Sequence, residues 1–204
     1  MTPLLIATGN KGKLRELQQL LSDLPFDLMG LDDIPGLEPV LETGGTFVEN
    51  ANLKASSYAK QSGLLTLADD SGLEVEALKG APGVLSARYV GEGASDRQRV
   101  EKLLADLSNV AAPGRTARFV SAVATANSNG SILNVSVGIC EGRIACEPQG
   151  TDGFGYDPIF IPTGSEMTFA ELAPEVKNQI SHRHRALERV HEFLRNLTRD
   201  SAAG

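Results

Sequence analysis

The chain has 204 residues, a formal net charge of −7 and a hydrophobic fraction of 41%. This length is enough to bury a substantial core, and we expect one domain over residues 1–204. The negative charge argues against a polynucleotide binder, because such affinity rests on many contacts from Lys and Arg to phosphates. A small anion is not excluded, since it needs only a few cations in one cleft.

A membrane-spanning protein and a cysteine-bound zinc site are also disfavoured. The longest apolar stretches are far shorter than the roughly 20 residues of a membrane span, and Gly9 comes too early for a signal-peptide core. We therefore expect a cytoplasmic protein without membrane contact. The two cysteines, Cys140 and Cys146, lack a zinc-binding spacing, and we expect both to be buried, reduced thiols.

The predicted elements alternate between strands and helices, which indicates an α/β protein with a mixed sheet. The bounds of these elements are predicted from apolar periodicity, from two capping-box patterns (Thr46 to Glu49 and Ser95 to Gln98) and from the Asn129-Gly130 turn signal. In chain order we expect a strand at 3–7, a helix through 14–21, a strand at 26–29, a helix from about 46 to 61, a strand at 64–68, a helix opened by Ser95, a hairpin of strands 116–126 and 131–141, a strand at 159–161 and a helix from about 181 to 197.

The turn from Thr8 to Lys13, "TGNKGK", lies between the first strand and the first helix. Free backbone N–H groups and the positive end of the helix dipole make such a turn a natural phosphate site. Gly9 and Gly12 would allow close approach, and Asn10 and Lys13 would add donors. The turn lacks the spacing and the Ser/Thr of a P-loop. An ordinary turn with solvated lysines is the alternative on these residues alone.

Carboxylates are the second candidate feature. Asp69 and Asp70 stand where an apolar strand is expected to stop, which is where open α/β sheets place ligands. Neighbouring strand residues point to opposite faces, so at most one of the pair would face a cleft while the other supports it. Glu42 ends the acidic loop. A simple Asp-Asp-Ser-Gly turn and a solvated glutamate are the alternatives.

Two further segments draw attention. Gly153 to Pro158 places Phe154 and Tyr156 among glycines in a chain with only 5% aromatic residues, an arrangement that suits a flat ligand stacked on a ring. A turn packing two aromatics into the core is the alternative. Ser181 to Arg185 would open the last helix, with Ser181 as its N-cap. Solvated cations at a capped helix start are the alternative there.

Six segments, taken together and in order, resemble the inosine/xanthosine triphosphate pyrophosphatase family. They are "ATGNKGKLREL" at 7–17, "ETGGTFVENANLKA" at 42–55, "ADDSGLEVEAL" at 68–78, "GAPGVLSARY" at 80–89, "GFGYDPIF" at 153–160 and "KNQISHRHRAL" at 177–187. The resemblance implies an elongated mixed sheet flanked by helices, with two lobes around a central substrate cleft. It also implies a homodimer and Mg²⁺-dependent hydrolysis of ITP, dITP or XTP to the monophosphate and pyrophosphate.

The resemblance also implies roles for individual residues. Asp70 would be the general base and, with Glu42, a Mg²⁺ ligand. Residues expected at the triphosphate are Thr8, Gly9, Asn10, Lys11, Gly12, Lys13 and Lys54. Ser71 matches a substrate contact. Residues expected at the nucleoside are Phe154, Gly155, Tyr156, Asp157, Lys177, His182 and Arg183, with Phe154 as the stacking ring.

Chemistry agrees with these roles. Mg²⁺ is commonly shared between one or two carboxylates and substrate phosphates. A 6-keto purine presents an acceptor where adenine presents a donor, so donors such as Arg183 would select against adenine. Two other readings stay open: a catalytically silent nucleotide-binding module, and a pyrophosphatase with broader base preference.

Overall fold

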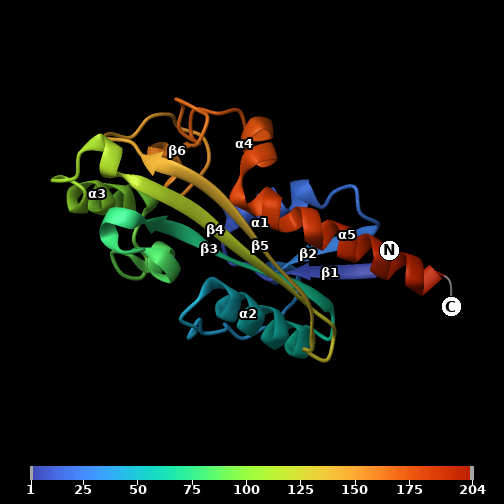
Figure 1. Cartoon of the computed structure of the whole chain (residues 1–204). Coiled ribbons are helices and arrows are strands. Elements are labelled where there is room, and N and C mark those ends of the chain that lie inside the picture. Colours follow the sequence, from blue (N-terminus) through green and yellow to red (C-terminus); the bar gives the residue numbers. More distant parts are fainter. Residues whose placement is uncertain (1, 203–204) are drawn as a thin grey trace. The chain divides into compact units, whose positions relative to one another are not determined.

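The computed structural model describes residues 2–202, of which the side chains of 2–199 can be discussed. The strands are β1 (Thr2–Ile6), β2 (Phe26–Gly30), β3 (Leu65–Val75), β4 (Thr116–Ala126), β5 (Ile132–Ile144) and β6 (Phe160–Pro162) (Figure 1). The helices are α1 (Lys11–Leu20), α2 (Phe47–Ser62), α3 (Asp96–Asp106), α4 (Pro174–Ile180) and α5 (His182–Ala202), and short 3-10 helices such as Gly83–Arg88 lie between them.

The described residues form two compact units. The first consists of residues 2–70, 121–138 and 183–202, and the second of residues 71–120 and 139–182. Strand order is β2-β1-β3-β4-β5 in the first unit and β3-β4-β5-β6 in the second. The expectations of a single domain, an elongated shape and a central cleft stay predictions.

The sheet is mixed, as the sequence predicts. In the first unit β1 pairs in parallel with β2 and with β3, with Leu4 opposite both Leu28 and Leu65. In the second unit β5 and β6 are antiparallel, with Ile144 opposite Phe160. Strands β4 and β5 are neighbours joined by residues 127–131, and a connection this short allows only antiparallel pairing.

Helices α1 and α5 cover one face of the sheet in the first unit. Their apolar residues recur every three or four positions, so each helix has one apolar stripe, and the two stripes pack on alternate residues of the strands. Burying these side chains supplies the main favourable free energy of this unit, at about 25 cal/mol per Å² of apolar surface. This core contains Leu4, Ile6, Leu17, Leu21, Leu67, Val123, Ala186, Leu187, Val190 and Leu194.

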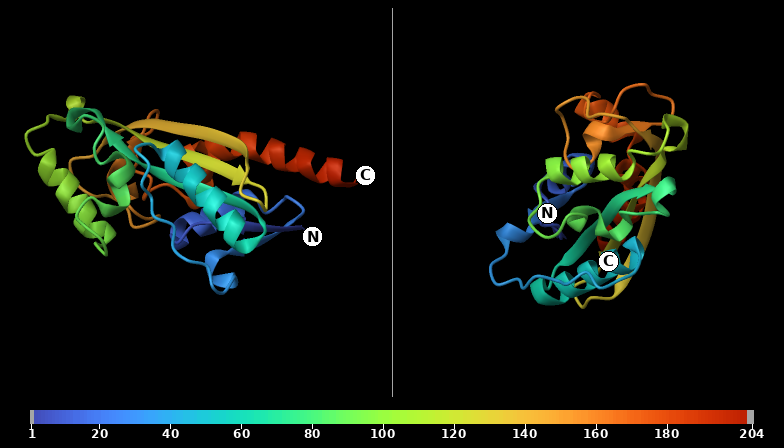
Figure 2. Two further views of the ribbon diagram at one scale, coloured as in Figure 1. Left: turned by 90° about the horizontal axis from the view of Figure 1, so that it is seen from below. Right: turned by 90° about the vertical axis from the view of Figure 1, so that its left-hand side faces the viewer.

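Helix α2 begins and ends as its sequence predicts. Thr46 accepts a hydrogen bond from the N–H of Glu49, and Glu49 binds back to the cap, so the capping box is confirmed. At the other end the β4–β5 turn lies beside α2 (Figure 2). Gly130 in that turn has φ +88°, and a Cβ there would stand 2.4 Å from Cε of Lys60. The tight turn therefore requires glycine.

The second unit has a separate, more aromatic core. Phe119 lies edge-on to Phe160 at 4.7 Å between ring centroids and stacks on Phe169 at 6.0 Å, geometries that aromatic pairs prefer. Helix α3 adds Val100 and Leu103, whose spacing was predicted. Ser95 caps α3 and Gln98 closes the capping box, also as predicted.

Several expectations need correction. Strand β3 does not stop at residue 68 but continues through Asp69 and Asp70 to Val75, so the Asp-Asp-Ser-Gly segment is not a turn. Charged side chains stay within this strand because buried partners compensate them, as described below. Cys140 is buried, but Cys146 is exposed, against expectation, since it follows the end of β5. Helix α4 was not predicted.

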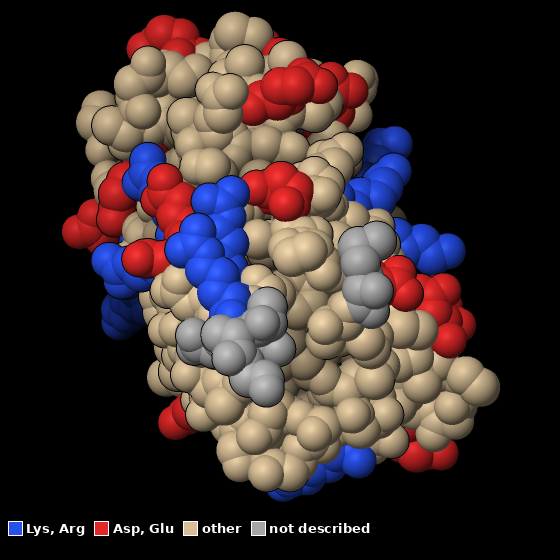
Figure 3. Space-filling model, turned by 90° about the vertical axis from the view of Figure 1, so that its right-hand side faces the viewer, with Lys and Arg blue, Asp and Glu red and all other residues tan. Residues whose placement is uncertain are grey.

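The surface is mixed in charge on the face in Figure 3, where Lys and Arg side chains lie beside Asp and Glu. An exposed pair of this kind joins Arg195 to Asp23 at 2.8 Å. Within the described part of the chain, no helix combines the length and apolarity that a membrane crossing requires.

Candidate active site

The turn between β1 and α1 is organised by Asn10. Its side-chain oxygen accepts hydrogen bonds from the N–H groups of Gly12 and Lys13, at 2.8 and 3.1 Å. Asn10 is thus the N-cap of α1, and its own N–H binds Oγ1 of Thr8. The cap occupies two of the N–H groups that we expected to be open to a phosphate. Asn before a helix is a common N-cap, so the sequence offered this signal.

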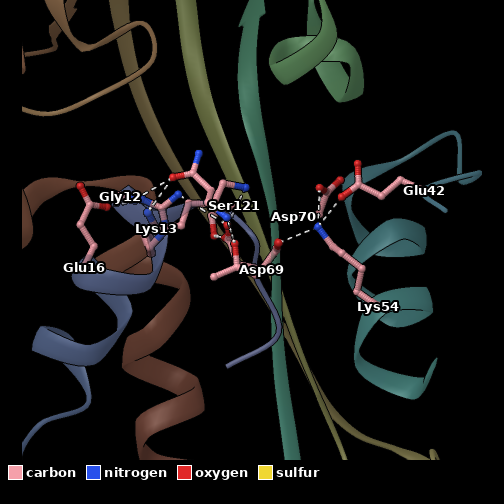
Figure 4. A network of polar contacts seen from close by, with 11 residues as sticks. Gly12, Lys13, Glu16, Glu42, Lys54, Asp69, Asp70 and Ser121 are labelled. Carbon is pink, nitrogen blue, oxygen red and sulfur yellow. Dashed lines mark hydrogen bonds and ion pairs between the residues drawn. The ribbon is translucent and has the colours of Figure 1, made fainter. Parts of the chain in front are cut away.

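Asp69 and Asp70 lie on opposite faces of β3 and are met by cations from different helices. Nζ of Lys13, on α1, is 2.9 Å from Oδ2 of Asp69, and Nζ of Lys54, on α2, is 2.9 Å from Oδ1 of Asp70. Figure 4 shows the two lysines approaching the strand from its two sides. The alternation predicted for this pair is confirmed.

Asp69 is completely buried and is also held by Ser121 and Arg183. Ser121, on β4, donates a hydrogen bond to Oδ1, and a guanidinium nitrogen of Arg183 lies 3.5 Å from Oδ2. Burial alone would raise the pKa of Asp69, but the charges of Lys13 and Arg183 outweigh it and hold that pKa well below its usual value. The surrounding charges therefore favour the ionised form of Asp69.

Arg183 also forms an ion pair with Glu16, one turn after Lys13 on α1. Its guanidinium is buried, with a side-chain exposure of 2%. Buried arginines need such carboxylate partners, because an unpaired buried charge is costly. Lys13, Asp69, Arg183 and Glu16 thus form one continuous charge network within the first unit.

Lys54 connects the other two carboxylates. Its ammonium group donates to Oε1 of Glu42 at 2.7 Å, to the backbone oxygen of Asp69 at 2.8 Å and to Oδ1 of Asp70 at 2.9 Å. Burial would lower the pKa of Lys54, but the two carboxylates raise it. The lysine is therefore charged and occupies the space between Glu42 and Asp70.

Asp70 has the properties of a base and of a metal ligand. Burial raises its pKa, against the opposing charge of Lys54. Its second oxygen, Oδ2, is buried and has no hydrogen-bond partner among the described residues. Such an atom suits a cation or a water molecule. Because no cluster of three or more metal-binding side chains occurs in the described part of the chain, phosphates and waters would have to complete the shell of a Mg²⁺ ion.

In the second unit, carboxylates hold the backbone of the segment from Phe154 to Asp157. Oδ2 of Asp157 accepts from the N–H of Phe154 at 2.8 Å and from Nζ of Lys177 at 2.6 Å. Asp96, the first residue of α3, accepts from the N–H of Gly155 at 2.7 Å. A Cβ on Gly153, where φ is +79°, would stand 2.1 Å from Oδ2 of Asp157, so only glycine fits.

Phe154 is the one aromatic ring of this segment that is half-exposed. Nζ of Lys177 lies 4.9 Å from its ring centroid, within the range of a cation–π contact. Tyr156 is buried and donates to the backbone oxygen of Ser86 at 2.9 Å. The second unit therefore presents the ring of Phe154 on a support made by Tyr156 and Asp157.

The remaining predicted residues lie as follows. His182 is buried and stacks on Phe119 at 4.7 Å between centroids, so its ring belongs to the aromatic core of the second unit. Ser71 is half-exposed on β3. Gly9 is exposed in the turn before α1, and Lys11 is exposed as the first residue of α1.

Sequence reasoning missed three residues that hold these groups: Glu16, Ser121 and Asp96. Glu16 follows Lys13 by three positions, a spacing that places both on one helix face and could have suggested a shared role. Asp96 could have been noticed only as a helix-start residue. Ser121 lies inside an apolar strand, and nothing local signals its partner 52 positions away.

Comparison with known proteins gives a consistent result. A model described as the Ham1 family matches residues 4–193. A dITP/XTP pyrophosphatase of Geobacter sulfurreducens is 50% identical over 194 residues, covering 95% of this chain and 97% of the relative. A dITP/XTP pyrophosphatase of Halalkalibacterium halodurans is 45% identical over 190 residues, covering 93% and 97%.

A solved structure of a HAM1 protein from Coxiella burnetii is also similar. It has a TM-score of 0.84 and 45% identity, with coverage of 96% of this chain and 100% of that one.

Proposed function

The chain belongs to the Ham1 family, and from this premise we propose that it hydrolyses dITP, ITP and XTP to the nucleoside monophosphate and pyrophosphate. The observation that carries the proposal is 45–50% identity, over nearly the whole chain, to relatives named dITP/XTP pyrophosphatases. The carboxylates and lysines of the first unit supply groups that this chemistry needs. Removal of deaminated purines from the nucleotide pool would be the physiological result.

The first unit would act on the triphosphate. Lys13 and Lys54 bring positive charge for the phosphates, and the turn from Thr8 to Lys13 adds backbone donors. Asp70 accepts a proton from a water molecule as the water oxygen attacks the α-phosphorus. The bond from that phosphorus to the bridging oxygen then breaks, and pyrophosphate leaves. The raised pKa of Asp70 suits a general base, because a base works best when its pKa is nearer the operating pH.

Glu42 and Asp70 would hold Mg²⁺. The buried, unpartnered Oδ2 of Asp70 supports this role. When bound, the ion would neutralise charge that develops on the phosphates. Lys54 contacts both carboxylates, so it limits their mutual repulsion and keeps them near each other.

The second unit would recognise the nucleoside. Phe154 offers a ring face for stacking, and Asp157 and Lys177 keep its segment in place. In this proposal Ser71 contacts the substrate, and Lys177 and His182 of this unit belong to the nucleoside site. Arg183, which lies in the first unit, is also assigned to it. Arg183 would discriminate against adenine because a guanidinium only donates hydrogen bonds, whereas a 6-keto oxygen accepts them.

The deciding experiment identifies the products formed from each nucleotide. Purified protein is incubated with Mg²⁺ and dITP, XTP, dGTP or dATP, and products are separated by ion-exchange chromatography. We expect monophosphate and pyrophosphate, with kcat/KM highest for dITP and XTP. Diphosphate and orthophosphate would exclude the proposed reaction. Equal kcat/KM for all bases would indicate a broader pyrophosphatase, and tight dITP binding without turnover across several divalent metals would indicate a silent binding module.

We also propose, from the resemblance, that the protein is a cytoplasmic homodimer. Light scattering coupled to size exclusion at micromolar concentration measures the mass directly. A monomer mass of 21.6 kDa would contradict the dimer.

A further inference from the structure

We propose that Asp69 is a positioning residue, which holds the ammonium group of Lys13 charged and aimed for binding the triphosphate. The inference deepens the proposed function, because it takes Lys13 as a phosphate ligand. It concerns a residue for which the sequence suggested only a supporting place in the strand.

The contact geometry carries the inference. Lys13 reaches from the first turn of α1 to Oδ2 of Asp69, at 2.9 Å. Asp69 cannot swing away, because Ser121 donates to its other oxygen and its side chain is completely buried. Lys13 itself retains 14% side-chain exposure. The buried, fixed carboxylate of Asp69 thus orients Lys13, whose side chain is still partly accessible to solvent.

The charges around Lys13 explain why it needs this partner. Burial lowers the pKa of Lys13, and so do the positive charges of Lys54 on α2 and Arg183 on α5. On β3, the charges of Asp69 and, to a smaller extent, Asp70 raise it. Asp69 is the largest influence that favours the charged form. Removing its charge would leave the lysine among cations in a buried place, where the neutral amine is favoured.

Asp69 is not simply a stabilising member of the core. A buried ion pair is weak support for stability, since desolvation offsets much of the attraction. A functional reason for the Asp69–Lys13 ion pair is that it keeps the positive charge of Lys13 at the start of α1, where an anion would bind.

The first test measures binding of inorganic tripolyphosphate by isothermal titration calorimetry, in EDTA, at pH 6.5 and pH 8.5. Asp69→Asn keeps the side-chain shape and an oxygen for the Ser121 hydroxyl but removes the charge. Loss of the Asp69 charge lowers the pKa of Lys13 further, and the neutral amine makes a weaker contact with phosphate, so we expect binding by the variant to weaken roughly tenfold or more between the two pH values. The wild-type protein should weaken much less. Equal or tighter binding by the variant at pH 8.5 would overturn the proposal.

A double-mutant cycle with Lys13→Gln separates this role from a general effect. If Asp69 acts through Lys13, Asp69→Asn should weaken tripolyphosphate binding strongly in the wild-type background and hardly at all when Lys13 is already Gln. Equal losses in both backgrounds would contradict the proposal, because Asp69 would then act without Lys13.

The second readout is the pH profile of kcat/KM with dITP and Mg²⁺. In Asp69→Asn the alkaline limb should move to lower pH, because Lys13 loses its proton earlier without the Asp69 charge. A loss of activity that is the same at every pH would indicate a merely structural role. If wild-type protein does not hydrolyse dITP, the proposed function fails, while the tripolyphosphate arm still decides the role of Asp69.

Two controls guard against misfolding. Circular dichroism and a urea midpoint test whether Asp69→Asn is folded. If it is not, Ser121→Ala keeps the Asp69 charge and removes only the hydrogen bond that fixes it. This variant should weaken tripolyphosphate binding by roughly 2- to 10-fold, the cost of one hydrogen bond, without moving the alkaline limb. Unchanged binding in a folded Ser121→Ala protein would contradict the positioning role. Asp27→Asn, at an exposed residue of β2, should change neither quantity.

Discussion

Buried charges in the first unit are held by charges from several helices, whereas buried groups in the second unit are held mainly by backbone contacts and aromatic packing. In the first unit Asp69 and Asp70 meet Lys13, Lys54 and Arg183. In the second, one buried pair, Asp157 with Lys177, supports the segment that carries Phe154.

The difference indicates a division of labour. A network of opposite charges can bind phosphates and move a proton, because its members respond to charge that develops during reaction. A rigid ring on a fixed backbone can sort flat ligands by stacking. Variants in the first unit should therefore alter turnover, and variants in the second should alter binding or stability. Four predictions test this contrast.

The largest effect is expected for Asp70→Asn. Loss of the proposed general base should lower kcat for dITP by about 10²–10⁴-fold. The fold should persist, because the amide fits the same space and removes a carboxylate whose pKa is raised by burial. Steady-state kinetics and a urea midpoint measure the two quantities. Asp27→Asn, which removes an exposed carboxylate from the same unit, is the matched control and should be unchanged. Near-normal turnover in Asp70→Asn would remove this residue from the base role.

Lys177→Met tests the buried pair of the second unit. The variant leaves Asp157 charged and buried, so the free energy of unfolding should fall by about 3–5 kcal/mol in urea denaturation. Adding Asp157→Asn should restore part of the loss, because the uncompensated charge is then gone while an oxygen remains for the N–H of Phe154. A loss below about 1 kcal/mol in the single variant would show that the pair is not a support.

Phe154→Ala tests whether the second unit contributes to binding. Stacking of a base on an aromatic ring is worth about 1–3 kcal/mol, so KM for dITP should rise by roughly 5- to 150-fold with little change in kcat. Met167→Ala, at an exposed apolar side chain of the same unit, is the control. Binding of inorganic tripolyphosphate should be unaffected by either variant. A fall in kcat with unchanged KM would break the proposed division between the units.

The smallest effect concerns acid stability and Asp69. Its pKa is lower in the folded chain than in the unfolded chain, where it is about 3.9, so its ionised form stabilises the fold above that pH. This contribution is lost as the pH falls below that value. The stability difference between wild type and Asp69→Asn should therefore shrink by roughly 1 kcal/mol from pH 5 to pH 3 in urea titrations. A constant difference would mean that Asp69 is not the ionised group.

Local patterns in the sequence were sufficient to predict most of the helices and strands. Both capping boxes lie where predicted, because each depends on residues only three positions apart. The hairpin around Gly130 and the amphipathic helices were also found, since their signals are periodic. Family motifs supplied the candidate residues, whose roles stay predictions. The end of β3 was misjudged, because two adjacent aspartates read as a turn when their partners are unknown.

The sequence alone determined which chemical groups are present: carboxylates and lysines that we propose for a triphosphate and a metal, and an aromatic ring among glycines. Only the tertiary structure decided which cation meets which carboxylate. Asp69 takes Lys13 and Asp70 takes Lys54, because alternate faces of one strand meet different helices. Those helices are far apart in sequence, and Ser121 and Arg183 come from still more distant segments. No local pattern encodes such pairings, which arise only when packing brings the segments together.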